Sequence, residues 1–283
     1  MNGRHFPFLL YWEHKRAREE NQEEKENMSI LEVNHLKKIY TTRFSGNQVQ
    51  ALSNLSFSVE EGEYVAIMGE SGSGKTTLLN ILAALDKPTG GEVLLNGKNI
   101  VEINEKEISA FRRENLGFVF QDFNLLDNFS IEDNIKLPLV LAGESPDDMD
   151  KKVRIVAEQL GIAELLKKYP YEVSGGQKQR TAVARAIISD PKMLFADEPT
   201  GALDSKASTN LLKQLRKINE NGQTILMVTH SNVAASYADR IMFIKDGEVF
   251  HQLYRGTMTR AELLDKICDS VTVLMRGGDE SES

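Results

Sequence analysis

The stretch Gly69-Glu70-Ser71-Gly72-Ser73-Gly74-Lys75-Thr76 decides the fold of this chain. Glycines at these positions let successive backbone N–H groups turn inward, and a helix that starts here points its positive end at an anion. The apolar residues 64–68 are typical of a buried strand that enters the loop, and apolar residues at 78, 81, 82 and 85 recur after it at helical spacing. The sequence therefore predicts a strand, a phosphate-binding loop and a helix, with Lys75 reaching the phosphates and the Thr76 hydroxyl placed for Mg²⁺.

A second acidic element follows further along the chain. Residues 192–196 are apolar enough for a buried parallel strand, which ends in Asp197-Glu198. At the carboxyl end of such a strand, Asp197 can hold Mg²⁺ through water and Glu198 can polarise an attacking water. Two solvated carboxylates at a strand end would give the same pattern, but the phosphate-binding loop upstream favours the catalytic interpretation.

Between these elements lies a second glycine-rich start of a helix. Ser174-Gly175-Gly176-Gln177 precedes a helical stretch with Ala184, Ile187 and Ile188 on one face, so it predicts a second anion site. One subunit does not need two such sites for a single γ-phosphate. A small glycine-rich helix cap is the plainer alternative.

The three elements, in this order, resemble the ATP-binding subunits of ABC transporters over residues 29–255. The resemblance implies an α/β fold: a P-loop NTPase core with a parallel sheet, an antiparallel β subdomain and an α-helical subdomain. It implies ATP and Mg²⁺ as cofactors and hydrolysis of ATP to ADP and phosphate. It also implies a head-to-tail dimer. In this dimer the signature loop of one copy, Ser174-Gly175-Gly176-Gln177, closes over ATP held by the other. Val173 stands where the family usually has Leu, which is a conservative change.

The resemblance also assigns the site residues. Those expected to act in hydrolysis are Lys75, Gln121, Glu198 and His230, and those expected at the metal are Thr76, Gln121 and Asp197. Those expected to contact nucleotide, in either copy, are Tyr40, Gly69, Ser71, Gly72, Ser73, Gly74, Lys75, Thr76, Thr77, Ser174, Gly175, Gly176, Gln177 and Asp204. An isolated glutamine or histidine after a strand is more often structural, and Tyr40 could be a plain strand tyrosine instead of the residue that stacks on adenine.

The chain divides into a charged leader at 1–28, flexible or helical, an ATP-binding domain at 29–255, and a C-terminal part at 256–283. The alternation of Leu55, Phe57 and Val59, and residues 92–95 before Asn96-Gly97, predict antiparallel strands. Residues 123–172 are expected to be helical, with prolines at 138, 146 and 170 as boundaries, and residues 193–251 alternate between strand and helix. The C-terminal part predicts a helix through Leu263, Leu264 and Ile267, then a disordered acidic tail from Gly277.

Composition agrees with this assignment. The 283 residues carry a formal net charge of −8, whereas a nucleic-acid binder usually shows a basic footprint, so no nucleic-acid partner is expected. The single cysteine, Cys268, cannot form an internal disulfide, which fits a reducing cytosolic setting. No run approaches the 18 or more apolar residues of a membrane span, and the apolar stretch at residues 6–12 is short and contains Pro7. A membrane part would therefore be a separate polypeptide.

The subtype rests on three further stretches, Phe111-Arg112-Arg113, residues 117–126 and residues 133–139. These are similar to the branch that contains macrolide exporters, lipoprotein-release complexes, the cell-division pair and peptide-antibiotic resistance exporters. Residues 123–127 with 137–141 look most like the bacitracin-resistance type of low-GC Gram-positive bacteria. That similarity implies a second copy of the chain, a permease on a separate chain, often a sensor kinase acting through the permease, and a place at the cytoplasmic face of the bacterial membrane.

Three other functions remain open from sequence. Within the family, the output could be mechanical or signalling, without passage of substrate. A soluble ABC ATPase acting on DNA or ribosomes usually has a long coiled-coil insertion or two nucleotide domains, and the sequence has neither. A small GTPase would need an Asn-Lys-x-Asp motif, which is missing, and would leave the signature loop unexplained.

Overall fold

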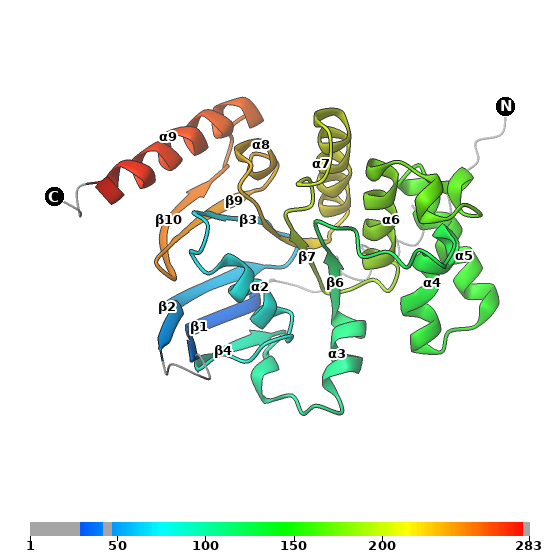
Figure 1. The fold of residues 1–283 in the computed structure, drawn as a ribbon, viewed down its shortest axis with the longest axis horizontal. Coiled ribbons are helices and arrows are strands. Elements are labelled where there is room, and N and C mark those ends of the chain that lie inside the picture. The colour runs from blue at the N-terminus through cyan, green and yellow to red at the C-terminus, as the bar shows by residue number, and fades with distance from the viewer. Residues whose placement is uncertain (1–28, 42–46, 280–283) are drawn as a thin grey trace, which may run out of the picture.

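The structure is a computed structural model that describes residues 29–41 and 47–279. The leader at 1–28, with its short apolar stretch, and the last four residues of the acidic tail lie outside the described residues. Figure 1 shows a central sheet with an antiparallel sheet below it and a group of helices at one side. The expected α/β fold, with its β and helical regions, is confirmed.

The central sheet has six strands in the order β10-β9-β3-β8-β7-β6. All its neighbouring strands are parallel except β9 and β10. The strands are β3 (Tyr64–Gly69), β6 (Leu116–Val119), β7 (Met193–Asp197), β8 (Thr224–Val228), β9 (Arg240–Lys245) and β10 (Glu248–Tyr254). Since the central strands are buried on both faces, they read as continuous apolar runs. Their parallel direction brings the segments after β3, β6, β7 and β8 to one edge of the sheet.

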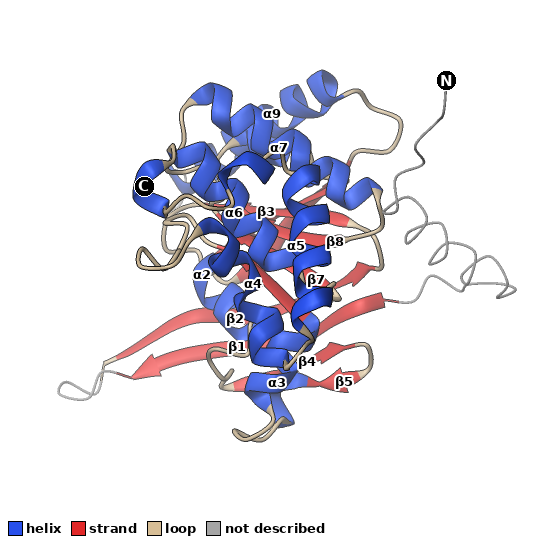
Figure 2. Cartoon of the chain, turned by 90° about the vertical axis from the view of Figure 1, so that its right-hand side faces the viewer, coloured by secondary structure: helices blue, strands red, loops and turns tan. Residues whose placement is uncertain are grey.

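The antiparallel sheet covers one face of the central sheet (Figure 2). Its strands, in the order β2-β1-β4-β5, are β2 (Gln48–Glu60), β1 (Ser29–Thr41), β4 (Gly90–Leu95) and β5 (Lys98–Asn99). The alternating Leu55, Phe57 and Val59 are all buried, as the sequence predicted. They join Val65 and Ile67 of β3 and the helices α2 (Lys75–Leu82) and α3 (Ile108–Asn115) in one core.

The remaining helices form a second core with the opposite face of the central sheet. Tyr64, Ala66 and Met68 point into this core, so successive residues of β3 serve the two cores alternately. The helices are α4 (Ile131–Ala142), α5 (Pro146–Gln159), α6 (Gly175–Ile187), α7 (Ser205–Glu220), α8 (Asn232–Ala235) and α9 (Arg260–Asp279), with short 3₁₀ turns at Ile100–Glu102, Ala163–Leu165 and Pro170–Glu172.

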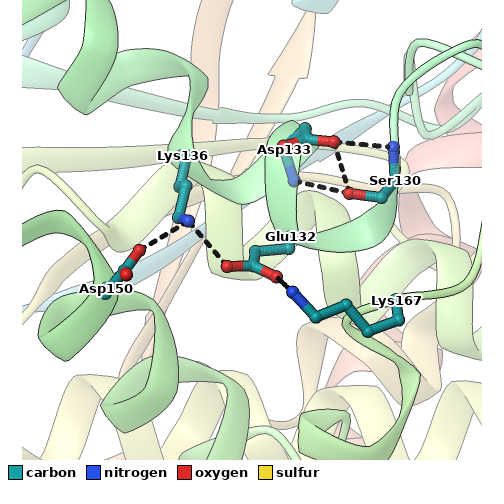
Figure 3. Close-up of polar contacts among 6 residues, drawn as sticks. All are labelled: Ser130, Glu132, Asp133, Lys136, Asp150 and Lys167. Atoms are coloured by element: carbon teal, nitrogen blue, oxygen red, sulfur yellow. Dashed lines mark hydrogen bonds and ion pairs between the residues drawn. The ribbon is translucent and has the colours of Figure 1, made fainter. Parts of the chain in front are cut away.

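An ion-pair network links neighbouring elements of the helical region (Figure 3). Glu132, in the first turn of α4, accepts hydrogen bonds from Lys136 and Lys167, each at 2.6 Å. Lys136 also lies 2.6 Å from Asp150 of α5. The two lysines lower the pKa of the Glu132 carboxyl. Because Lys167 lies in the segment that leads to Ser174, the network ties that segment to α4 and α5.

The helical prediction for residues 123–172 is wrong at its start and at one proline. α4 begins only at Ile131, where Ser130 and Asp133 form a capping box, and residues 123–130 are not helical. Pro138 lies inside α4 and does not bound it, whereas Pro146 and Pro170 each open a helical segment as expected. A proline inside a helix costs about 3 kcal/mol, and here the cap and the burial of one apolar face of α4 offset that cost.

Two helix ends also differ from the prediction. α2 ends at Leu82, Ala84 takes a left-handed φ of 54°, and Leu85 is half-exposed, so the helical spacing does not extend to Leu85. α9 continues through Gly277 to Asp279, where the sequence predicts a disordered tail. A glycine lowers helix stability by only about 1 kcal/mol relative to alanine, so two glycines do not have to end a helix that is anchored in the core.

Candidate functional site

The glycine-rich loop joins β3 to α2, as predicted. Gly74 is the N-cap of α2 with a left-handed φ of 96°, and a Cβ on it would lie 2.4 Å from the carbonyl oxygen of Ala51. A Cβ on Gly69 would lie 2.3 Å from the carbonyl oxygen of Ile244. Only glycine therefore allows the loop to lie this close to β2 and β9. No side chain caps the first turn of α2, which suits a helix end that receives an anion.

Lys75 is only 5% exposed, and its ammonium lies within the loop. It donates to the carbonyl oxygens of Gly69 at 2.9 Å and Glu70 at 2.6 Å, and to the Ser73 hydroxyl at 3.3 Å. Burial lowers its pKa, and the charges of Glu198 and Asp197 partly oppose that effect. The carboxylates at the end of β7 therefore lie close enough to Lys75 to act on its charge.

Asp197 is the last residue of β7, and Glu198 follows it with unusual backbone geometry. Burial raises the pKa of both carboxyl groups, while the charge of His230 lowers each of them. Glu198 has a left-handed φ of 43°, fixed by its N–H, which donates to the Val228 carbonyl at 2.9 Å, and by its carbonyl, which accepts from the Gly201 N–H at 2.9 Å. Such a conformation costs of order 1–3 kcal/mol and is common where a side chain must be aimed at a reaction.

The segment after β8 supplies two neighbours of Glu198. The Thr229 hydroxyl donates to Glu198 Oε2 at 3.2 Å, and His230 Nε2 lies 3.4 Å from Glu198 Oε1. His230 is the predicted residue, whereas sequence reasoning missed Thr229, which is fully buried. Its only signal is its place at the carboxyl end of a buried strand, directly before the histidine.

Gln121 reaches the same edge of the sheet from β6. It follows the strand after one intervening residue, Phe120. Its side chain lies against Gly201, because a Cβ built there would approach the Gln121 Cδ to 2.9 Å. Gln121 therefore borders the turn that begins at Glu198.

Tyr40 lies in β1 and is 41% exposed. Its hydroxyl donates to Asp86 Oδ2 at 2.8 Å, and the Lys38 ammonium lies 4.7 Å from the ring centroid. Burial and the Asp86 carboxylate raise the pKa of the phenol, and a hydrogen bond with Thr77 lowers it. Tyr40 therefore stands beside the first turn of α2, next to the loop.

The signature segment forms a second cluster on α6 and α7. Ser174 is the N-cap of α6 and forms a capping box with Gln177, and Asp204 is the N-cap of α7. A Cβ on Gly176 would lie 3.0 Å from the Ala207 Cβ, so the two helix starts touch. A cavity of about 460 Å³ lies beside them, and its lining includes Ser174, Gly176 and Asp204. Figure 1 shows α6 and α2 apart, with β6 and β7 between them, so the structure brings the predicted residues together in two clusters instead of one.

Among the described residues, no helix combines the length and the apolar character that crossing a membrane requires. Residues 52–201 match the family described as ABC transporter. The ABC transporter ATP-binding protein YxdL of Bacillus subtilis is 49% identical over 255 residues, which cover 90% of this chain and 97% of that protein. The bacitracin export ATP-binding protein BceA of Halalkalibacterium halodurans is 46% identical over 90% of this chain and 100% of its own. The macrolide export ATP-binding/permease protein MacB of Hyphomonas neptunium is 43% identical over 74% of this chain and 33% of its own.

A solved structure agrees with these sequences. The ATP-binding cassette MJ0796, in a dimeric post-hydrolysis state bound to ADP and Pi, is 37% identical and superposes with a TM-score of 0.72 over 79% of this chain and 98% of its own. The family match over residues 52–201 covers the loop, the signature segment and both carboxylates of the site described above. The chain belongs to the ABC transporter family, and it binds and hydrolyses ATP.

Proposed function

We propose that the chain drives a separate membrane permease that exports a peptide antibiotic, at the cytoplasmic face of a bacterial membrane. The observation that carries this proposal is the share of each relative's sequence that aligns with this chain. The chain aligns with all of BceA, named as a bacitracin export ATP-binding protein, but with a third of MacB, named as an ATP-binding/permease protein. This fits a chain that supplies ATP hydrolysis to a permease made elsewhere.

In this proposal the β- and γ-phosphates bind at the loop. Lys75 gives up its contacts with the Gly69 and Glu70 carbonyls for phosphate oxygens, and the N–H groups of residues 71–77 surround the anion at the start of α2. Glycine at positions 69 and 74 allows this loop conformation, because a Cβ at either position would clash with neighbouring backbone. Tyr40, beside Thr77, supplies the aromatic face for adenine.

The donor set suits Mg²⁺, which prefers oxygen ligands and is commonly held by one or two carboxylates together with substrate phosphates. The Thr76 hydroxyl, the Gln121 side-chain oxygen and Asp197 are such donors, and bound Mg²⁺ would neutralise charge on the phosphates. Glu198 accepts the proton of the attacking water, and His230 contacts the γ-phosphate. The half-buried Glu198 carboxylate and its fixed backbone support this role.

The signature cluster completes the site in a second copy of the chain. Ser174, Gly175, Gly176 and Gln177 close over the partner's nucleotide, and Asp204 communicates across the interface. The separation of this cluster from the loop and the dimeric state of MJ0796 support the arrangement. We expect Ser174→Arg and Lys75→Ala chains to be inactive alone and to regain part of the turnover when mixed, since one composite site then carries both lesions and the other carries none. A Gly176 variant is less suitable, because a side chain there disturbs Ala207 of its own chain.

Export is tested in a bacterial strain that lacks its own bacitracin exporter and carries this chain with its permease. Survival at graded bacitracin concentrations should rise with the parent chain and with Glu220→Gln, an exposed control, and should not rise with Glu198→Gln. If bacitracin stimulates ATP turnover without protecting the cells, the output is mechanical or signalling. Loss of a sensor kinase's response in the Glu198→Gln strain would support the kinase as a further partner.

A further inference from the structure

Gln179 of α6 is fully buried, and its amide group bridges two loops. Its Nε2 donates to the carbonyl oxygen of Phe120 at 3.0 Å and to that of Pro199 at 2.7 Å. These carbonyls come from segments far apart in the sequence, one after β6 and one after β7. A single side chain from a third element therefore holds the two segments together.

The two bridged residues are direct neighbours of predicted site residues. Phe120 immediately precedes Gln121, and Pro199 immediately follows Glu198. The Gln121 side chain also lies against Gly201, in the turn that Glu198 begins. The Gln179 bridge therefore fixes the position of Gln121 relative to Glu198.

Only the Nε2 group of the Gln179 amide forms hydrogen bonds. Its Oε1 is buried and has no hydrogen-bond partner, which costs free energy that an apolar side chain of the same size would avoid. The Glu198 backbone next to the bridge is held in a left-handed conformation, which needs surrounding restraint to persist. The unsatisfied oxygen is consistent with a residue kept for the two bonds that it donates.

The same helix restrains the Gln121 segment at a second point. Arg185 donates to the carbonyl oxygens of Asn124 at 2.6 Å and Phe123 at 3.1 Å, both residues with left-handed φ. Ser174 is the N-cap of α6. The helix that begins at the signature segment therefore also donates hydrogen bonds to the backbone on both sides of Gln121 and to the residue after Glu198.

We propose that Gln179 is a positioning residue for hydrolysis: it holds the Glu198 turn against the Gln121 segment and thereby aims the carboxylate, without touching ATP. The inference rests on the proposed roles of Glu198 and Gln121. Misplacement of a reacting group by about 1 Å can lower a rate 10²-fold, while the phosphate-binding loop on α2 stays intact. Gln179 thus acts on kcat and leaves ATP affinity unchanged.

The test compares Gln179→Met with Gln223→Met in the full chain. Gln223 directly precedes β8, at the end of that strand away from Thr229. It is a matched control, because it is also buried and its Nε2 also donates to two backbone carbonyls, those of Pro191 at 3.0 Å and Thr224 at 3.2 Å. We expect Gln179→Met to lower kcat about 10- to 100-fold, with the Kd for ATP within about threefold of the parent by calorimetry. Gln223→Met should lower the thermal unfolding temperature and keep the parental kcat.

A second arm separates positioning from a general defect. In a Glu198→Gln background, Gln179→Met should lower the residual turnover by less than about threefold, because the group that it aims is already gone. Parental kcat in Gln179→Met, or its full effect persisting in the double variant, overturns the inference. Parental turnover in Glu198→Gln alone would instead overturn the proposed role of Glu198. Should Gln179→Met not fold, Gln179→Glu keeps the size with one hydroxyl donor at most, and its kcat must fall in the same way.

Discussion

Replacing Glu198 with glutamine separates chemistry from binding and folding. In the structure Oε2 accepts a hydrogen bond from Thr229, which an amide oxygen also can accept, and Oε1 has no hydrogen bond to lose. The substitution therefore removes a half-buried negative charge, together with its 3.4 Å contact to His230 Nε2, and keeps the size of the side chain. Turnover should fall by about 10²–10⁴, the contribution of a positioned general base, and ATP affinity should not fall. Stability should rise by about 0.5–2 kcal/mol, as is common when a strained catalytic group is neutralised.

The sign of the stability change depends on pH. Burial raises the folded-state pKa of Glu198, so its charge lowers the free energy of unfolding. This loss of stability is absent below the ordinary glutamate pKa of about 4.3 and grows as the pH rises through the raised pKa. At pH 7.5 the melting temperature of Glu198→Gln should therefore exceed that of the parent, by roughly 2–4 °C for each kcal/mol gained in the free energy of unfolding. Near pH 4 the difference in melting temperature should vanish.

The assay measures ATP turnover, calorimetric ATP affinity and thermal unfolding on the same preparations. Glu63→Gln is the control, since the Glu63 side chain is only 13% exposed and is paired with Arg240 at 2.8 Å, just before β3 and at the opposite end of that strand from the site. Losing this paired charge should lower the melting temperature, with turnover retained below it. Turnover of Glu198→Gln within a few-fold of the parent refutes its role as base, and a lowered melting temperature at pH 7.5 refutes the burial argument.

Three further predictions follow from the same site. Lys75→Ala should weaken ATP binding about ten- to a hundredfold, because a charge-assisted contact is worth roughly 1.5–3 kcal/mol; unchanged calorimetric affinity would exclude Lys75 from the site. The acid limb of kcat should lie above the ordinary glutamate pKa of about 4.3, because burial raises the pKa of Glu198 and only its ionised form accepts a proton; a limb at or below that value would contradict this. Gly74→Ala should destabilise the fold far more than Gly72→Ala: both have positive φ, but only Gly74 would place its Cβ 2.4 Å from backbone, and equal melting temperatures would show that the steric reasoning fails.

The phosphate-binding loop and the buried strand before Asp197 could be predicted because local patterns encode them. A glycine-rich loop between an apolar strand and a helix, and a short apolar run that ends in acids, depend on few distant contacts. The parallel order of the strands then places Gln121, Asp197 and His230 at one edge, so their proximity follows from topology.

The bridges inside the site could not be predicted in this way. Thr229 and Gln179 are ordinary polar residues in the sequence, and their roles arise only when β6, β7, β8 and α6 meet. Pro138 inside α4 and the left-handed Glu198 both contradict local preference, and tertiary packing overrides it at each. Local propensity alone cannot predict where tertiary packing imposes an unfavourable conformation.

The place of β3 in the central sheet bears on how the protein is made. The strand that carries the ATP-binding loop pairs only with β8 and β9, which leave the ribosome much later. At about 5–20 residues per second, β9 is complete roughly ten to thirty-five seconds after β3. Until β8 and then β9 emerge, the two edges of this apolar strand lack their native partners, a state that invites pairing with other chains. β3 and its loop therefore reach their native place in the sheet only late in synthesis, and the new chain is open to mispairing until the sheet closes.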